Sequence, residues 1–312
     1  MSTNNIIRAV EIETIAHCNF FCKFCPYPLY PKDAKAMSME LFEEILDKAF
    51  AHQTISTVSI NSYTEPTIDK LFMQRCEMIK AKGLILLLHT NGSGLTVERL
   101  EQLKALGNIS QITINMPTLD PIKYTAVTGY KNINKIITII DKAIELGFVV
   151  DLSVNGTDEE VREALPALKE RWPSTIKHPC YLADPPVSIT NDRVGLISAV
   201  DGGKYDKKVN ITTPRLEGCE VPNSWLYINR DGDLFMCCED FQRKTVYGNI
   251  KDGSINDLLN SKRRCDMLEQ INGMQDAPED LICRKCLLMA IQTAVKERTR
   301  EAIRNSTDPE KL

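Results

Sequence analysis

Short runs of β-branched and aliphatic residues alternate with longer amphipathic stretches in the first half of the chain. The apolar runs predict strands at residues 7–14, 55–60, 84–90, 109–116 and 148–154. The stretches with helical period predict helices at residues 38–51, 66–82, 95–106, 131–146 and 158–171. This alternation predicts an α/β domain with a parallel sheet, built as a partial (β/α)6 TIM-like barrel. An open, doubly wound sheet is the alternative.

The alternation ends after residue 172, where prolines and glycines interrupt any regular element through residues 173–218. We place a domain boundary near residue 195, which gives a barrel domain at residues 1–195 and a smaller domain at residues 196–312. In the second domain, WLYINRDGDLFMCC predicts a hairpin that turns at residues 230–233. Further helices are predicted at residues 254–271 and 284–303.

Composition and charge narrow the class of partner. The chain has 38 basic and 42 acidic residues and a formal net charge of −4, which does not favour nucleic acid or a membrane surface. No basic segment followed by an apolar run opens the chain, and no stretch approaches the roughly 20 apolar residues of a membrane span. We therefore expect a cytoplasmic protein that acts on a small molecule or a peptide.

Cysteine usage points to metal chemistry. The chain has 11 cysteines, and cytosolic thiols are kept reduced, so disulfides are disfavoured. Eight of the cysteines form two groups, one near each end of the chain, which favours metal binding. The other three, Cys76, Cys180 and Cys265, have no cysteine neighbours and are expected to be structural.

The first cysteine group directly follows the first predicted strand, in AHCNFFCKFCPYP. Cys18, Cys22 and Cys25 have three and then two residues between them. Three thiolates leave a tetrahedral zinc site one ligand short, and His17 directly precedes Cys18, which makes it a poor fourth ligand. A 4Fe-4S cluster accommodates that shortage, because three irons bind cysteine and the fourth stays open to a small molecule. The spacing therefore favours an iron-sulfur cluster over zinc.

This three-then-two spacing in the loop after the first strand resembles the radical S-adenosylmethionine (SAM) superfamily, with Phe24 in the aromatic place beside the last cysteine. The resemblance covers residues 7 to about 155. It implies that the open iron of the cluster on Cys18, Cys22 and Cys25 binds SAM. It also implies that one electron cleaves SAM to a 5′-deoxyadenosyl radical, and that an electron donor such as flavodoxin or ferredoxin supplies that electron.

Two loops resemble the SAM-binding segments of that superfamily. NSYTEP at residues 61–66 takes the place of a Gly-Gly-Glu-Pro segment, although both glycines are replaced, and implies that Glu65 meets the SAM amino group. A negative charge at a helix N-terminus is the alternative role of Glu65. HTNG at residues 89–92 resembles the Thr-Asn-Gly turn beside the ribose and implies contacts from Thr90 and Asn91. An ordinary turn would use the same residues.

The fifth predicted strand ends in polar residues that share one face. Ser153 and Asn155 alternate along the chain, so both side chains point the same way. We expect them to hold the SAM ribose or carboxylate. They are equally compatible with ordinary polar residues at a strand end.

The second cysteine group lies in the C-terminal part. Cys219, Cys237, Cys283 and Cys286 supply four thiolates, which suit zinc or a 4Fe-4S cluster alike. Their order, with Gly232 before Cys237 and a final two-residue spacing, resembles the auxiliary-cluster domains of radical SAM enzymes, called SPASM with two clusters and Twitch with one. No cysteine follows Cys286, so the resemblance implies the Twitch form, with one auxiliary 4Fe-4S cluster.

Two segments narrow the resemblance within the superfamily. TNDRVGLIS and CCEDFQRKTVYGNI resemble 2-deoxy-scyllo-inosamine dehydrogenase and related aminoglycoside-modifying members. By that likeness Arg193 is expected to contact the substrate. A solvated arginine is the alternative.

Cys238 bears on the type of reaction. It follows Cys237, and neighbouring residues on a strand point to opposite faces, so Cys238 is expected to remain a free thiol. Such a thiol can return a hydrogen atom to a substrate radical, as in radical SAM epimerases, and we predict epimerisation with Cys238 as the donor. The alternatives are a dehydrogenase that oxidises an alcohol or amine carbon of an aminoglycoside-like or peptide substrate, and a zinc-binding interaction module. Cys238 could also be a small buried residue or a spare ligand.

Overall fold

A computed structural model describes residues 6–177, 192–206, 209–293 and 296 of the chain. Within these residues a single sheet has the strand order β5-β4-β3-β2-β1-β6-β7-β8. Neighbours from β5 to β6 pair in parallel, whereas β7 and β8 are added in antiparallel pairs. The strands are β1 (Ala9–Ile12), β2 (Thr57–Ile60), β3 (Ile85–Thr90), β4 (Ile109–Asn115), β5 (Val150–Ser153), β6 (Trp225–Ile228), β7 (Asp233–Phe235) and β8 (Gly248–Asn249).

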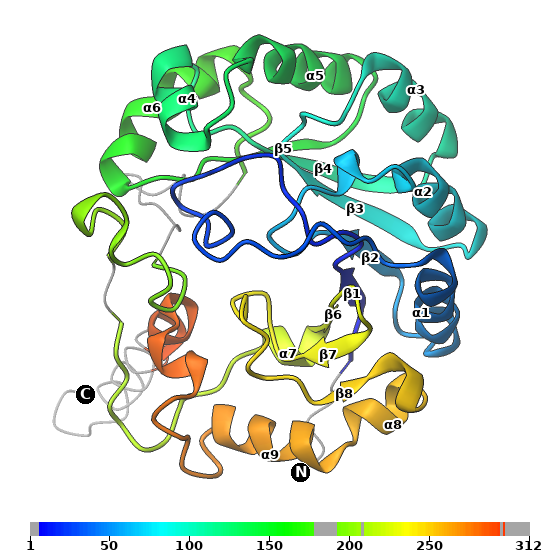
Figure 1. The fold of residues 1–312 in the computed structure, drawn as a ribbon, viewed down its shortest axis with the longest axis vertical. Helices are drawn as coiled ribbons and strands as arrows, with labels where there is room; N and C mark the ends of the chain where they lie inside the picture. Colours follow the sequence, from blue (N-terminus) through cyan, green and yellow to red (C-terminus); the bar gives the residue numbers. More distant parts are fainter. Residues whose placement is uncertain (1–5, 178–191, 207–208, 294–295, 297–312) are drawn as a thin grey trace, which may run out of the picture.

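Helices form an arc around the outer side of the parallel strands, as in a partial barrel (Figure 1). The predicted α/β class with a parallel sheet is confirmed. The helices of this part are α1 (Met39–Ala51), α2 (Phe72–Ala81), α3 (Val97–Leu106), α4 (Pro121–Thr128), α5 (Ile133–Glu145) and α6 (Asp158–Arg171), with the short η1 (Pro66–Ile68) before α2. Apolar residues from each long helix pack on the sheet and form the core.

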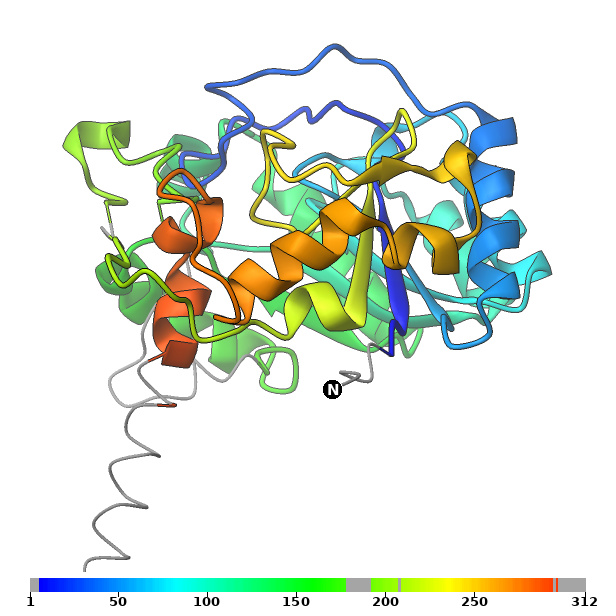
Figure 2. The same ribbon diagram turned by 90° about the horizontal axis from the view of Figure 1, so that it is seen from below.

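The C-terminal part adds short elements at the β6 end of the sheet, where α8 lies near β8 and α9 is tied to α7 by a hydrogen bond from Arg264 to the Pro222 carbonyl (Figures 1 and 2). The predicted hairpin forms, since β6 and β7 pair in antiparallel fashion. The prediction that Cys237 and Cys238 lie on its second strand is wrong, because β7 ends at Phe235. The short elements are η3 (Val200–Gly202), α7 (Val221–Ser224), η4 (Ile250–Asp252), α8 (Ile255–Leu259), α9 (Lys262–Ile271) and η5 (Ile282–Lys285). Residues 287–293 are helical, and the rest of the helix predicted at 284–303 lies largely outside the described residues.

Two predicted helices are interrupted, and one helix was not predicted. Asp69 separates η1 from α2, because its carboxylate accepts from the Leu71 backbone N–H and pairs with Arg75. The stretch predicted at 254–271 is divided into α8 and α9, and Ser261 begins α9 by accepting from the Arg264 backbone N–H. Helix α4 has only eight residues, too few to show a clear period.

Strand β6 joins the two predicted domains. It lies beyond the boundary placed at residue 195, yet its residues pair with β1 along the whole strand. The two parts therefore share one sheet, and the boundary stays a prediction. In the described residues no helix has the length and apolar character required to cross a bilayer.

Candidate functional site

The first cysteine group lies in a long loop between β1 and α1 that is fixed by backbone hydrogen bonds. The loop pairs with itself where the Met37 N–H donates to the Thr14 carbonyl at 2.8 Å. It is also tied to the end of α4, because Phe21 N–H donates to the Thr128 carbonyl and Lys23 N–H to the Val127 carbonyl, both at 2.9 Å. Helix α4 therefore helps to place the three cysteines, which gives this unpredicted element a role in the site.

The thiols of this loop are close enough to affect one another. Burial raises the pKa of the Cys18 thiol to about 12, and the charges of Glu65 and Cys25 add to that rise. Burial also raises the pKa of Cys22, again with contributions from Cys25 and Cys18. Cys22 is buried, and Cys18 and Cys25 are half-buried. Thiols that disfavour one another's ionisation in this way are suited to bind a cationic group as thiolates.

The placement of the three thiols bears on the kind of metal group that they could hold. In the part of the chain that the structure describes, no three His, Cys, Asp or Glu side chains are placed to hold one metal ion. A 4Fe-4S cluster binds each thiolate at a different iron, so its ligands lie farther apart than those of a single ion. The three thiols on one ordered loop fit such a cluster.

Glu65 is buried at the end of β2 and is surrounded by donors. Its carboxylate accepts from Thr67 N–H at 3.0 Å, from the Thr90 hydroxyl at 2.6 Å and from Asn91 N–H at 2.5 Å. Burial raises the pKa of the carboxyl, and these donors oppose the rise. Because Glu65 caps η1 through Thr67, its alternative role at a helix N-terminus is present in the structure.

Glu65 also connects the HTNG turn to the cysteine loop. The Asn91 side-chain amide lies 3.8 Å from Cys18 Sγ and donates to Asn19 Oδ1 at 3.1 Å. The backbone of the cysteine loop joins the same network, because Glu65 N–H donates to the His17 carbonyl at 2.9 Å. Three of the predicted SAM contacts, Glu65, Thr90 and Asn91, therefore meet beside Cys18.

Ser153 and Asn155 come together at the end of β5, as the alternation predicts. The Asn155 side-chain amide donates to Ser153 Oγ at 2.8 Å and to Asn115 Oδ1 at 3.0 Å. Asn115 was not singled out in the sequence. The parallel pairing of β4 with β5 places it beside Ser153, which sequence spacing alone does not reveal.

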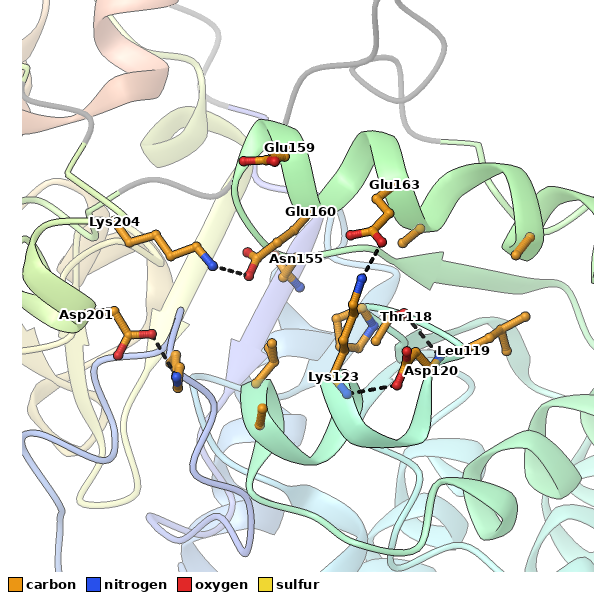
Figure 3. Close-up of a pocket in the computed structure, with 16 residues that line it drawn as sticks. Thr118, Leu119, Asp120, Lys123, Asn155, Glu159, Glu160, Glu163, Asp201 and Lys204 are labelled. Carbon is orange, nitrogen blue, oxygen red and sulfur yellow. Dashed lines mark hydrogen bonds and ion pairs between the residues drawn. The ribbon is translucent and has the colours of Figure 1, made fainter.

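Asn155 lines a cavity of about 520 Å³ between α4, α6 and the segment around η3 (Figure 3). Lysines and carboxylates face each other across it. Lys23 pairs with Asp201 at 2.7 Å and Lys204 pairs with Glu160 at 2.6 Å. The cavity follows the carboxyl ends of β4 and β5, the edge at which parallel sheets commonly bind ligands.

The four predicted auxiliary ligands line one cavity in the C-terminal part. Cys219, Cys237, Cys283 and Cys286 face it together with apolar side chains that include Met236, Ile271, Leu288 and Met289. Burial raises the pKa of Cys237, and the charges of Cys238, Cys283 and Cys286 add to the rise. Four thiols in an apolar cavity fit an iron-sulfur cluster.

Cys238 lines the same cavity, but its other neighbours differ from those of Cys237. Its thiol lies near the Tyr227 hydroxyl and near Glu11. Glu11 and Tyr227 are side by side because β1 and β6 pair at these residues. Burial raises the pKa of Glu11 to about 7, and the charge of Arg243 lowers it. Cys238 is thus in contact with a buried, titratable part of the sheet.

Arg193 connects the cysteine loop to the C-terminal part. Its Nε donates to the Phe24 carbonyl at 3.3 Å, and its Nη1 pairs with Glu239 Oε1 at the same distance. The guanidinium lies 5.5 Å from the centre of the Tyr63 ring, and the Tyr63 hydroxyl is 3.5 Å from Glu239. Tyr63 and Glu239 were not predicted as site residues, although both lie in segments that resemble the superfamily, because the sequence does not show that these two segments meet. Cys180 lies outside the described residues.

Sequence comparisons assign both parts of the chain to known families. The profile of the radical SAM superfamily matches residues 12–175, and that of the SPASM iron-sulfur cluster-binding domain matches residues 219–287. An S-adenosyl-L-methionine-dependent 2-deoxy-scyllo-inosamine dehydrogenase from Niallia circulans is 23% identical, over 93% of this chain and 96% of that protein. A tungsten-containing aldehyde ferredoxin oxidoreductase cofactor-modifying protein from Pyrococcus furiosus is 28% identical over a shared segment. That segment makes up 40% of this chain and 35% of that protein.

Solved structures share the fold. BtrN in complex with AdoMet and 2-DOIA has a TM-score of 0.59 and 19% identity, covering 86% of this chain and 88% of that one. AnSMEcpe with bound AdoMet has a TM-score of 0.61 and 14% identity, covering 90% of this chain and 86% of that one. The superfamily profile matches more than half of the chain, on the loop and strands that hold Cys18, Cys22 and Cys25. The chain therefore belongs to the radical SAM superfamily, whose members use SAM and a 4Fe-4S cluster, and its C-terminal part is an iron-sulfur cluster-binding domain of the SPASM family.

Proposed function

We propose that the protein abstracts a hydrogen atom from a carbon of a small polar substrate and inverts that carbon, with Cys238 returning the hydrogen atom. A bound, reduced cluster would supply the electron for SAM cleavage, and the resulting 5′-deoxyadenosyl radical would abstract the hydrogen atom. The observation that carries this proposal is a fifth thiol in the cavity of the four proposed ligands. Cys238 lines that cavity and also lies near Tyr227 and Glu11.

Seven cysteines are proposed as cluster ligands. Cys18, Cys22 and Cys25 would hold the SAM-binding cluster, because their thiols lie close together on one ordered loop. A single auxiliary cluster, as in the Twitch form, would be held by the four cysteines that share an apolar cavity, Cys219, Cys237, Cys283 and Cys286.

The SAM contacts are proposed on two sides of the cysteine loop. Glu65, Thr90 and Asn91 lie beside Cys18, where they would orient the amino acid part of SAM. Ser153 and Asn155 lie at the end of β5 and would orient the ribose, with the adjacent cavity open to the nucleoside. An electron donor such as flavodoxin or ferredoxin would reduce the cluster.

Oxidation is the second candidate, and the full-length relative favours it. That relative is a dehydrogenase that matches 93% of this chain. In a dehydrogenase the substrate radical loses a proton and passes one electron to the auxiliary cluster. Arg193 is the proposed substrate contact in both cases, since it lies between the cysteine loop and the residue that follows Cys238. A peptide substrate remains the alternative to a small molecule.

The two outcomes are separated with 2-deoxy-scyllo-inosamine as the probe, incubated in D2O with SAM and dithionite. An epimerase should return the probe with inverted configuration and one deuterium at carbon, because the Cys238 thiol exchanges with solvent. A Cys238→Ala variant should lose this product and still release 5′-deoxyadenosine. The matched control is Cys265→Ala, which removes a thiol from α9 and should change nothing.

A product two hydrogens lighter than the probe, formed equally by the wild type and by Cys238→Ala, would show the dehydrogenase instead. SAM cleavage with no change in the probe would exclude amino-cyclitols of this kind as substrates. The three results are distinguished by the mass and the chromatographic mobility of the recovered probe.

A further inference from the structure

The side chain of Asn91 is engaged by the cysteine loop and by its own turn. Its amide nitrogen lies 3.8 Å from Cys18 Sγ and donates to Asn19 Oδ1 at 3.1 Å. Its amide oxygen accepts from the Ser93 backbone N–H at 2.8 Å, and the residue is 7% exposed. The Asn91 backbone N–H is used separately, because it donates to Glu65 at 2.5 Å. The side chain therefore acts on the cysteine loop, and the backbone acts on Glu65.

Asn19 and Ser93 fix the direction of this amide. Asn19 Nδ2 donates to Ser93 Oγ at 2.9 Å, which closes a ring of hydrogen bonds among Asn19, Asn91 and Ser93. The ring is also tied to α5, because the Lys135 ammonium donates to the Ser93 carbonyl. In a buried network of this kind each hydrogen bond holds the next group in place. The amide nitrogen of Asn91 is thus directed at Cys18 by the protein alone.

Cys18 Sγ has a second N–H donor beside it. The Phe20 backbone N–H donates to this sulfur at 3.4 Å, so one donor comes from the main chain and one from a side chain. Every residue except proline supplies a main-chain donor, whereas an amide donor requires asparagine or glutamine. The Asn91 contact is therefore the one of these two that depends on the identity of a side chain.

A donor at a cluster ligand affects the reduction potential of the cluster. Hydrogen bonds to the sulfurs are one of the factors that set the potentials of iron-sulfur clusters. A reduced 4Fe-4S cluster carries one more negative charge than the oxidised cluster, so an N–H donor stabilises the reduced state more strongly. The donor therefore raises the potential, and removing it should make reduction harder.

We propose that Asn91 raises the reduction potential of the cluster on the first cysteine group by acting through Cys18, with Asn19 and Ser93 as the residues that position its amide. This inference rests on the cluster assignment in the function proposed above and deepens it. It is compatible with a role of the same turn in binding SAM, because that role uses the backbone N–H of Asn91 and the carboxylate of Glu65.

The test is a reductive titration without SAM or substrate, followed by electron paramagnetic resonance. The signal of the first cluster is the one that disappears in the variant with alanine at Cys18, Cys22 and Cys25. Loss of a typical hydrogen bond in Asn91→Ala should make the equilibrium constant for reduction about fivefold smaller, which lowers the potential by about 40 mV at 59 mV per tenfold. Asn19→Ala should lower it by less. The auxiliary signal should keep its potential in both variants.

Thr90→Val is the matched control. It removes a hydroxyl from the same turn, but that hydroxyl donates to Glu65 and not to sulfur, so the potential of the first cluster should stay unchanged. An equal fall in Thr90→Val would overturn the inference, because the effect would then belong to the whole turn. An unchanged potential in Asn91→Ala would also overturn it, and weaker SAM binding in that variant would leave the proposed function standing.

The opposite result separates the two proposals as well. A lowered potential in Asn91→Ala, in a protein that converts no substrate, would support the inference and contradict the proposed function. If Asn91→Ala loses iron from the first cysteine group, wild-type protein with isotopically labelled nitrogen in its asparagine side chains decides. Magnetic coupling of that nitrogen to the reduced first cluster is expected in pulsed paramagnetic resonance, and its absence would overturn the inference.

Discussion

Replacing Arg284 by alanine should remove the auxiliary cluster and leave the cluster on the first cysteine group in place. Arg284 lies between Cys283 and Cys286 and is 6% exposed. Its guanidinium donates to five backbone carbonyls from two loops, those of Ile211, Thr213, Pro214, Ala277 and Pro278. Each buried carbonyl left without a donor costs about 1–3 kcal/mol, so the alanine variant should lose the geometry of both ligand cysteines.

Iron analysis and electron paramagnetic resonance measure this effect. Arg284→Ala should fall from about eight irons per chain to about four and lose only the auxiliary signal. Arg215→Ala is the control, because Arg215 is in one of the same loops but is exposed and pairs with the exposed Asp276. Full iron content in Arg284→Ala would show that the four thiols are placed without this side chain.

Replacing Glu65 by alanine should abolish most SAM cleavage while both clusters remain. The substitution leaves the buried donors of Thr67, Thr90 and Asn91 without their acceptor. Hydrogen bonds to charged groups contribute about 1.5–3 kcal/mol each, so the turn beside Cys18 should move. A loss of about 3 kcal/mol in SAM positioning corresponds to a rate roughly 100-fold lower.

The rate of 5′-deoxyadenosine formation and SAM affinity by equilibrium dialysis check the Glu65 prediction. Glu98→Ala is the control, since Glu98 lies in the first turn of α3, after the same β3 loop, at an exposed position. Cleavage at the wild-type rate in Glu65→Ala would mean that Glu65 serves only to cap η1. Glu65→Gln keeps one acceptor oxygen, so its rate of 5′-deoxyadenosine formation should lie between those of the wild type and of Glu65→Ala.

Much of the barrel could be predicted because its signals are local. The five predicted strands each contain the observed strand, since buried parallel strands appear as continuous apolar runs. Helix α4 was missed, although Asp120 before Pro121 is a recognisable start signal. The cysteine groups were evident from spacing alone, and the superfamily match favours an enzyme over the zinc-binding interaction module.

The rest of the site depends on contacts between distant segments, which one sequence does not reveal. Asn115 joins Ser153 and Asn155 only because β4 pairs with β5 in that register. Tyr63 meets Glu239 across 176 positions of the chain. Arg284 resembles any arginine within a two-residue cysteine spacing until its five carbonyl partners are placed around it.

The central claim, that this is a radical SAM protein with one cluster on each cysteine group, is tested most directly on anaerobically reconstituted protein. Iron, sulfide, paramagnetic resonance and SAM cleavage are measured on the wild type and on a variant with alanine at Cys18, Cys22 and Cys25. About eight irons should fall to about four in the variant, with 5′-deoxyadenosine formation lost. A variant that still cleaves SAM, or a wild type that binds no iron, would contradict the account.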